Sequence, residues 1–411
     1  MPLRSAAFLL LLLLISGTAP GQDPVAAQRP KVRTLTAFVR LDRASYRVQV
    51  EDALHMLRAA KAAFANAGYE VETLRITSQP FPEYVGGLTA EQALAFFRDY
   101  DQLARREGFT PDIGPAMSKD TDDAKQADLL AQILKNTESI NGFIVVADEQ
   151  GIHRNSIRAA AQVIKYLEEQ TSHSEGNFRF AAGAFPPANA PFFPVSSTQA
   201  EGHAFAIGLE SANLAAQAFA GVQEDTAAAG ERLTAVLSDA AKKVEALARS
   251  VEKQSGWKYQ GIDLTPVPLK DISIGAAMES LLGGPIGSPG SLGAAYTITS
   301  ALQRVPVLRT GYSGLMLPVL EDSVLAKRWE EGTINRDALL AYSSVCSTGL
   351  DAVPLPGDIS QRELENIIAD MASLAVKWHK PLSVRLLPVA GKKAGDMTDF
   401  GSPYLVNVHL R

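Results

Sequence analysis

The chain of 411 residues contains one cysteine, Cys346, so no disulfide can form within it. A zinc site of the multi-thiolate type is excluded for the same reason. The 39 basic and 45 acidic residues are well mixed, and aromatic residues make up only 7% of the chain. Because no basic stripe or stacking surface is visible, nucleic acid is not a predicted partner.

Long apolar runs are also lacking, apart from one near the N-terminus. This run, Ala6–Ile15, follows Arg4 and is too short for the roughly 20 residues that span a bilayer. Small residues follow it, which is typical of a secretory signal peptide. We predict a signal peptide over residues 1–27, one large domain over residues 28–411, no membrane span after cleavage, and a secreted or periplasmic location.

Several familiar catalytic motifs are absent as well. No Gly-x-Ser-x-Gly nucleophile elbow occurs, and the six histidines show no metal-binding spacing. The glycine-rich stretch Gly283–Gly293 is neither a Walker motif nor a dinucleotide fingerprint. It is interpreted as a connecting loop, with an anion cradle as the alternative.

What the sequence does contain is an alternation of strand-like and helix-like segments along most of its length. Strands are expected at Val32–Leu41, Tyr69–Ile76, Asn141–Ala147, Asn177–Gly183, Trp257–Leu264, Tyr312–Val319, Gly349–Leu355, Leu382–Val389 and Tyr404–His409. Helices are expected at Tyr46–Ala67, Leu88–Glu107, Asp122–Lys135, His153–Gln170, Gly202–Phe219, Thr226–Lys253, Ser273–Leu282, Ala294–Gln303, Glu321–Glu331 and after Ser360, where Glu363 completes a capping box. The alternation predicts an α/β protein with parallel strands, either a closed barrel or a doubly wound sheet.

The stretch Ala341–Asp358 is the first candidate for chemistry. It holds Cys346, Asp351 and Asp358 among small residues and prolines, between two predicted helices. Functional side chains are often placed on such tight connections. The alternative is a buried structural cysteine beside a turn.

Further polar side chains follow the predicted strands, where sites gather in parallel α/β proteins. They are Asp263, Glu321, Asp322, Lys392, Lys393 and Asp396. Acids and a lysine pair suit an anionic or carbonyl substrate, and Glu321 with Asp322 suits a divalent cation as cofactor. The alternative is that the two acids favour a helix N-terminus and the lysines are solvated.

Five blocks of sequence carry a resemblance. They are FAIGLESANL (205–214), GIDLTPVP (261–268), GYSGLMLPVLEDS (311–323), VCSTGLDAVPLPGD (345–358) and RLLPVAGKKAGDMTDF (385–400). The chain resembles the uncharacterised domain of unknown function 711 family, of UPF 0210 type, also described as pyruvate formate-lyase-like. The resemblance implies a ten-stranded α/β barrel and a homodimer, and it implies no established activity.

Glu210 and Ser313 lie within these blocks and are predicted to contact a substrate. Two departures from the family pattern stand out, the predicted export signal and Ser347 where glycine is expected. The radical-glycine segment of glycyl-radical enzymes is missing from the C-terminal tail, so that chemistry does not carry over.

Together these features predict an exported enzyme whose reaction is unknown. Its site would lie at the mouth of the barrel and take a small-molecule ligand. Cys346 would be nucleophile or acid/base, Asp263, Asp351 and Asp358 would orient substrate or metal, and Lys392 and Lys393 would neutralise an anion. The alternatives are a periplasmic solute-binding protein that uses the same pocket, and a structural dimer whose site has decayed.

Overall fold

The structure is a computed structural model that describes residues 29–199, 202–346 and 348–411. The predicted signal peptide and the departure at position 347 lie outside the described residues. No helix of the described ranges is both long enough and apolar enough to cross a bilayer.

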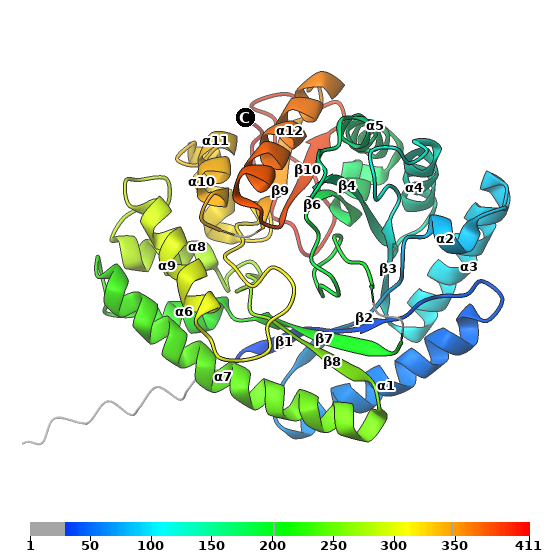
Figure 1. Ribbon diagram of the computed structural model, residues 1–411. Helices are drawn as coiled ribbons and strands as arrows, with labels where there is room; N and C mark the ends of the chain where they lie inside the picture. The colour runs from blue at the N-terminus through cyan, green and yellow to red at the C-terminus, as the bar shows by residue number, and fades with distance from the viewer. Residues whose placement is uncertain (1–28, 200–201, 347) are drawn as a thin grey trace, which may run out of the picture.

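Ten strands form one mixed sheet that curls around the centre of the molecule (Figure 1). Their order across the sheet is β8-β7-β1-β2-β3-β4-β6-β10-β9, with the short β5 paired to β4. The strands are β1 (Lys31–Phe38), β2 (Val71–Thr77), β3 (Thr110–Pro115), β4 (Asn141–Asp148), β5 (Gly151–Ile152), β6 (Phe180–Ala184), β7 (Ala204–Glu210), β8 (Lys258–Asp263), β9 (Gly349–Pro356) and β10 (Leu382–Val389).

The sheet changes direction twice. Strands β1, β2, β3, β4 and β6 run parallel to one another. Strand β7 is antiparallel to β1, and β10 is antiparallel to β6. Because β8 follows the direction of β7, and β9 that of β10, both outer pairs run opposite to the five central strands.

The predicted α/β class is confirmed, but the closed ten-stranded barrel is not. The outer strands β8 and β9 do not pair with each other, and residues 308–320, which we call the bridging segment, lie between them. Ile262 of β8 exchanges backbone hydrogen bonds with Leu308 and Thr310, and Val319 donates to the Asp351 carbonyl of β9 at 3.0 Å. The sheet is therefore open, with a non-strand segment in its gap.

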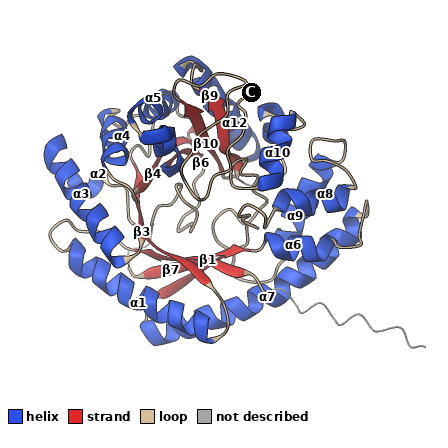
Figure 2. Cartoon of the chain, turned by 180° about the vertical axis from the view of Figure 1, so that it is seen from behind, coloured by secondary structure: helices blue, strands red, loops and turns tan. Residues whose placement is uncertain are grey.

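Helices cover the outside of the curled sheet (Figure 2). They are α1 (Tyr46–Asn66), α2 (Pro82–Val85), α3 (Ala90–Glu107), α4 (Lys125–Asn136), α5 (Arg154–Gln170), α6 (Ala212–Phe219), α7 (Thr226–Ser255), α8 (Ile274–Leu282), α9 (Ser291–Gln303), α10 (Ser323–Glu331), α11 (Arg336–Ser343) and α12 (Gln361–Trp378), with a 3-10 helix η1 (Ser172–Arg179) before β6. The main core lies between these helices and the outer face of the sheet. The predicted capping box of Ser360 and Glu363 is confirmed at the start of α12.

The inner face of the sheet packs against loops instead of helices. Residues 185–199, which we call the inner loop, contribute Phe192 and Val195 to a small inner core. Met316 of the bridging segment joins the same cluster, together with Phe143 of β4. These two irregular segments thus fill part of the space that the curled sheet surrounds. The rest of that space is a cavity with a partly polar wall.

Three predicted elements differ from the structure, and the strand β3 was not predicted. The helix expected at Gly202–Phe219 is wrong in its first half, which is the fully buried strand β7, because burial in the sheet overrides the helix propensity of its Ala and Leu residues. The strands expected at Tyr312–Val319 and Tyr404–His409 are wrong, since each forms only an isolated bridge. Strand β3 was not expected because Pro111 and Pro115 interrupt it, and its pairing is correspondingly sparse.

Candidate functional site

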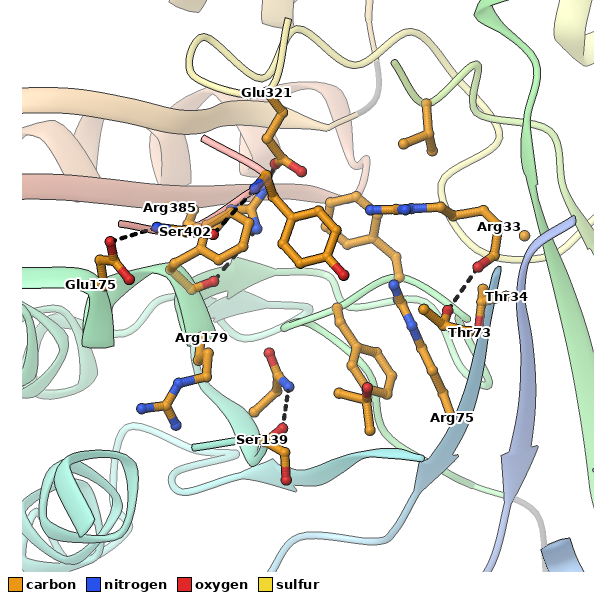
Figure 3. A pocket seen from close by; sticks show the side chains of 18 of the residues that line it. Arg33, Thr34, Thr73, Arg75, Ser139, Glu175, Arg179, Glu321, Arg385 and Ser402 are labelled. Atoms are coloured by element: carbon orange, nitrogen blue, oxygen red, sulfur yellow. Dashed lines mark hydrogen bonds and ion pairs between the residues drawn. The ribbon is translucent and has the colours of Figure 1, made fainter. Parts of the chain in front are cut away.

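The inner side of the sheet holds a cavity of about 660 Å³ (Figure 3). We call it the arginine cavity because four arginines contribute to its wall. They are Arg33 of β1, Arg75 of β2, Arg179 of η1 and Arg385 of β10. The remaining wall combines hydroxyl and amide side chains, several acids, and apolar residues of the inner loop and bridging segment.

The reversal of strand direction explains which residues meet there. The first half of β1 and the starts of β3 and β4 reach the cavity, as shown by Thr34, Thr110 and Asn141. From the antiparallel strands, the last residues of β7 and β8 reach it, including Leu209 and Asp263. One end of the sheet therefore gathers carboxyl ends of some strands and amino ends of others.

Arg75 is the least satisfied cation in the cavity wall. Its Nη1 donates to the Pro191 carbonyl at a long 3.4 Å, and its buried Nε has no hydrogen-bond partner among the described residues. No carboxylate of the described ranges forms an ion pair with it, and its guanidinium lies 4.5 Å from the ring centre of Phe193. Burial and the positive charge of Arg33 lower the pKa of Arg75 to about 9, so it stays charged near neutral pH.

Arg33 and Arg179 have partners already. Arg33 forms an ion pair with Glu72 at 2.6 Å, and its guanidinium lies 5.8 Å from the ring centre of Tyr404. Arg179 donates to the main-chain carbonyls of Leu134 and Ile140. In Figure 3 the guanidinium groups of Arg33 and Arg75 extend into the same part of the cavity, whereas Arg179 points away from them.

Arg385 is held between two buried acids. Its Nε donates to Asp351 at 2.6 Å and its Nη2 to Glu321, while the other oxygen of Asp351 has no partner among the described residues. One cation therefore faces two carboxyl groups. Burial raises the pKa of Glu321, and the charge of Arg385 opposes that shift.

Asp263 lies in the wall, but its carboxylate is fully engaged. It accepts the hydroxyl and amide of Thr265, at 2.6 and 2.9 Å, and the amides of Tyr312 and Ser313, each at 3.0 Å. Gly311 has a positive φ of 63°, and a side chain there would collide with this carboxylate. Asp263 thus anchors the bridging segment to the end of β8, and Ser313, which was predicted to contact substrate, takes part in that anchor.

The two residues predicted as metal ligands have different surroundings. Glu321 faces the cavity, whereas Asp322 caps α10 by accepting the amides of Val324 and Leu325. Asp322 also accepts the Ser273 hydroxyl at 2.6 Å. Within the described ranges, no group of three or more His, Cys, Asp or Glu side chains could hold a metal ion.

Cys346 lies away from the cavity. It precedes the start of β9, whereas Asp263 ends β8, and these two strands run in the same direction, so the residues lie at opposite ends of the sheet. The side chain of Cys346 is 1% exposed and packs in the main core. Its carbonyl accepts a hydrogen bond from Lys380. The structure therefore does not bring the thiol together with the acids, and the alternative of a buried structural cysteine describes its surroundings.

The other predicted residues lie outside the cavity wall. Asp358 is exposed, Lys392 is 3.9 Å from Asp399, and the Lys393 amide donates to the exposed Asp396 at 2.7 Å. Glu210 ends β7 at the cavity end of the sheet, but both of its oxygens are buried and without partners among the described residues. Burial and the neighbouring Glu72 raise the pKa of Glu210 to about 7.

The arginines were not singled out from the sequence, although a signal was present. Arg33, Arg75 and Arg385 each interrupt a segment that otherwise consists largely of strand-forming residues. A charged residue within a buried strand is rare unless it is paired or used. Site residues of parallel α/β proteins are expected after strands, whereas these three arginines lie within strands.

Residues 24–402 match the family described as Uncharacterised ACR (DUF711). A UPF0210 protein of Pyrobaculum aerophilum is 31% identical over 86% of this chain and 82% of its own length. One of Pyrobaculum arsenaticum is 30% identical over 84% and 80%, and one of Bifidobacterium longum is 25% identical over 92% and 89%. The further likeness to pyruvate formate-lyase is not confirmed by these matches. The resemblance seen in the five sequence blocks is confirmed: the chain belongs to the DUF711 family of uncharacterised proteins.

Proposed function

We propose that the protein binds a small organic anion in the arginine cavity, with Arg75 as the anchor. The observation that carries this proposal is the incomplete pairing of Arg75. A buried charge without a partner is costly, whereas hydrogen bonds from a guanidinium to a carboxylate or phosphate are strong. An anion bound beside Arg75 would supply the missing acceptors.

Binding is favoured over thiol catalysis because Cys346 lies in the main core, away from the cavity. This corresponds to the solute-binding alternative. The cavity volume of about 660 Å³ is within the range of roughly 300–1,000 Å³ found for small-molecule sites.

The test is a thermal-shift and calorimetric comparison with acetate, propanoate, benzoate and inorganic phosphate. We expect at least one of these anions to raise the melting temperature of the wild type, and Arg75→Gln to weaken its binding about 10- to 100-fold. Arg362→Gln, which removes an exposed arginine of α12, is the matched control and should bind like the wild type.

Stability without ligand gives an independent measurement. A purely structural arginine would destabilise the fold when removed, whereas Arg75→Gln should unfold at the same or a higher denaturant concentration than the wild type, because it removes an uncompensated charge. Unchanged anion binding in Arg75→Gln would contradict the proposal.

An enzyme is the second candidate, and Glu321 is the observation that favours it. Its carboxyl group lines the cavity, and burial raises its pKa, as is common for catalytic acids and bases. If the protein turns over its ligand, Glu321→Gln should abolish turnover while anion binding persists. Asp370→Asn, at an exposed position of α12, is the control. Turnover that survives in Glu321→Gln would exclude this role.

Export and dimerisation are further parts of the proposal. The support for export is the apolar run Ala6–Ile15 after Arg4, and that for a dimer is the family resemblance. Cell fractionation with N-terminal sequencing should find a mature protein beginning near residue 28 outside the cytoplasm. Light scattering should give twice the mass of one chain.

A further inference from the structure

We infer that the ligand of the arginine cavity is a monocarboxylate with an apolar, ring-sized body, rather than a very small acid or a polyanion. This inference rests on the proposed function, because it describes the ligand of the same cavity. It follows from three observations: the charge balance of the wall, the apolar surface left uncovered there, and the volume.

The charges around Arg75 set the number of negative charges in the ligand. Two other cations of the wall donate to uncharged groups, Arg179 to main-chain carbonyls and Lys135 to Gln170. Arg33 is paired with Glu72, and Arg385 faces Glu321 and Asp351. Arg75 is the cavity cation that lacks both a carboxylate and well-formed hydrogen bonds within the described ranges. A single carboxylate matches it, whereas a second negative charge would lie near carboxyl groups that already outnumber Arg385.

The apolar wall indicates what the rest of the ligand is. Phe178, Phe193 and Val267 line the cavity and keep part of their surface exposed. Phe192 and Met316 lie beside them and are backed by the inner core. Covering such surface with an apolar group is favourable by about 25 cal/mol per Å², so the wall favours a ligand that brings apolar area with it.

The apolar and charged parts of the wall adjoin one another. Three of its arginines each lie against an aromatic ring: Arg75 at 4.5 Å from the centre of Phe193, Arg385 at 4.5 Å from that of Phe178, and Arg33 at 5.8 Å from that of Tyr404. A ring that lies against the face of a guanidinium does not occupy its donor edge, and of these three arginines only Arg75 has an edge without a carboxylate partner among the described residues. The geometry therefore suits a ligand whose carboxylate and apolar body are joined by a short link.

The volume excludes a very small acid as the best-fitting ligand. A cavity of about 660 Å³ exceeds by far what acetate or formate would fill, and much of it would remain occupied by water. A ring-sized body would displace that water from the faces of Phe178 and Phe193.

The experiment uses the full mature chain and four probes in isothermal titration calorimetry. The first, 3-phenylpropanoate, has both a carboxylate and a ring. Propanoate has the carboxylate only, and 3-phenylpropan-1-ol has the ring only. The fourth probe is inorganic phosphate. We expect 3-phenylpropanoate to bind at least about tenfold more tightly than each of the other three, since a buried ring and a charge-assisted hydrogen bond each contribute that much or more.

Variants separate the two contributions. Phe193→Leu should weaken 3-phenylpropanoate more than propanoate, and Val267→Ser provides the same test if Phe193→Leu does not fold. Arg75→Gln should weaken both acids and leave the alcohol unchanged. Arg362→Gln should change none of them.

The outcomes distinguish this inference from the proposed function. Equal affinity for propanoate and 3-phenylpropanoate would contradict the inference that the ligand has an apolar body, but would still support the anion site. Tighter binding of phosphate than of 3-phenylpropanoate would contradict the inference that the ligand carries a single negative charge. If no probe binds in a manner that depends on Arg75, the proposed function fails together with the inference.

Discussion

The two ends of the curled sheet are built differently. At the end that holds Cys346, the thiol is buried among apolar side chains and Lys380 donates to main-chain carbonyls. At the cavity end, Arg75 lacks adequate acceptors and one oxygen of Asp351 has no partner among the described residues. Native proteins satisfy nearly all buried polar groups. Unpaired buried atoms also occur elsewhere, at Asp112 and Ser156 for example, but Arg75 combines one with a charge and a position in a cavity wall. The cavity end is therefore the one to associate with a ligand, and the lone cysteine lies at the other end.

Replacing Arg385 should lower the free energy of unfolding more than any other substitution predicted here. A small effect would contradict the difference between the two ends of the sheet. Arg385→Met leaves Glu321 and Asp351 buried without their cation, which typically costs about 3–5 kcal/mol of unfolding free energy. Chemical denaturation measures it. The triple variant Arg385→Met, Glu321→Gln, Asp351→Asn should recover most of the loss, and a single variant as stable as the wild type would show that the cluster is not buried as described.

Glu210 should make the cavity end sensitive to pH. In the unfolded chain this carboxyl loses its proton near its usual pKa of 4.5, whereas in the folded chain it keeps the proton until about pH 7. Between these values the folded state binds more protons, so its contribution to stability falls as pH rises. The full shift corresponds to about 3 kcal/mol, and solvent screening reduces it to about 2 kcal/mol. Glu210→Gln should flatten this part of the stability profile and be more stable than the wild type at pH 8; a profile that does not change would contradict the buried, unpartnered carboxyl.

Cys346→Ala tests the end of the sheet that holds the buried thiol. Loss of the buried sulfur should cost about 1 kcal/mol of unfolding free energy through a small cavity. Anion binding, measured by calorimetry, should equal that of the wild type because the thiol is remote from Arg75. A variant that folds normally but no longer binds the anion would restore the thiol as a functional group.

The smallest effect is expected for the lysine pair. Lys392→Ala with Lys393→Ala should change stability by about 0.5 kcal/mol or less, because neither side chain has more than a weak surface ion pair among the described residues. Affinity for the probe anion at physiological ionic strength should also be unchanged. A large loss of affinity would extend the binding site beyond the arginine cavity.

The fold class could be predicted because periodicity and capping are local. The helix after Ser360 and the buried strand Asn141–Asp148 are examples, since nothing distant changes their pattern. Strand β7 was misread because its Ala and Leu residues favour a helix until the sheet buries them on both faces.

The candidate site could be predicted only in part, for a topological reason. Asp263 ends the outer strand β8 and Glu321 follows the bridging segment, so the rule that sites follow strands predicts both. Asp351 is predicted instead from the stretch around Cys346. Arg33 and Arg75 lie in central strands of the opposite direction. Strand direction depends on long-range pairing, which a single sequence does not reveal. The prediction that Cys346 and Asp263 lie at the same end of the sheet is wrong for a simpler reason. Cys346 precedes its strand β9, whereas Asp263 ends its strand β8.

The bridging segment also has a consequence for folding. Its backbone bonds to β8 on one side and to β9 on the other, so its place exists only once both of those strands have formed. Until it docks, an assembling chain presents two bare strand edges, which are the features through which protein chains aggregate. Residues 308–320 are therefore where a destabilising substitution would be expected to lower the yield of soluble protein more than its effect on the finished fold would suggest.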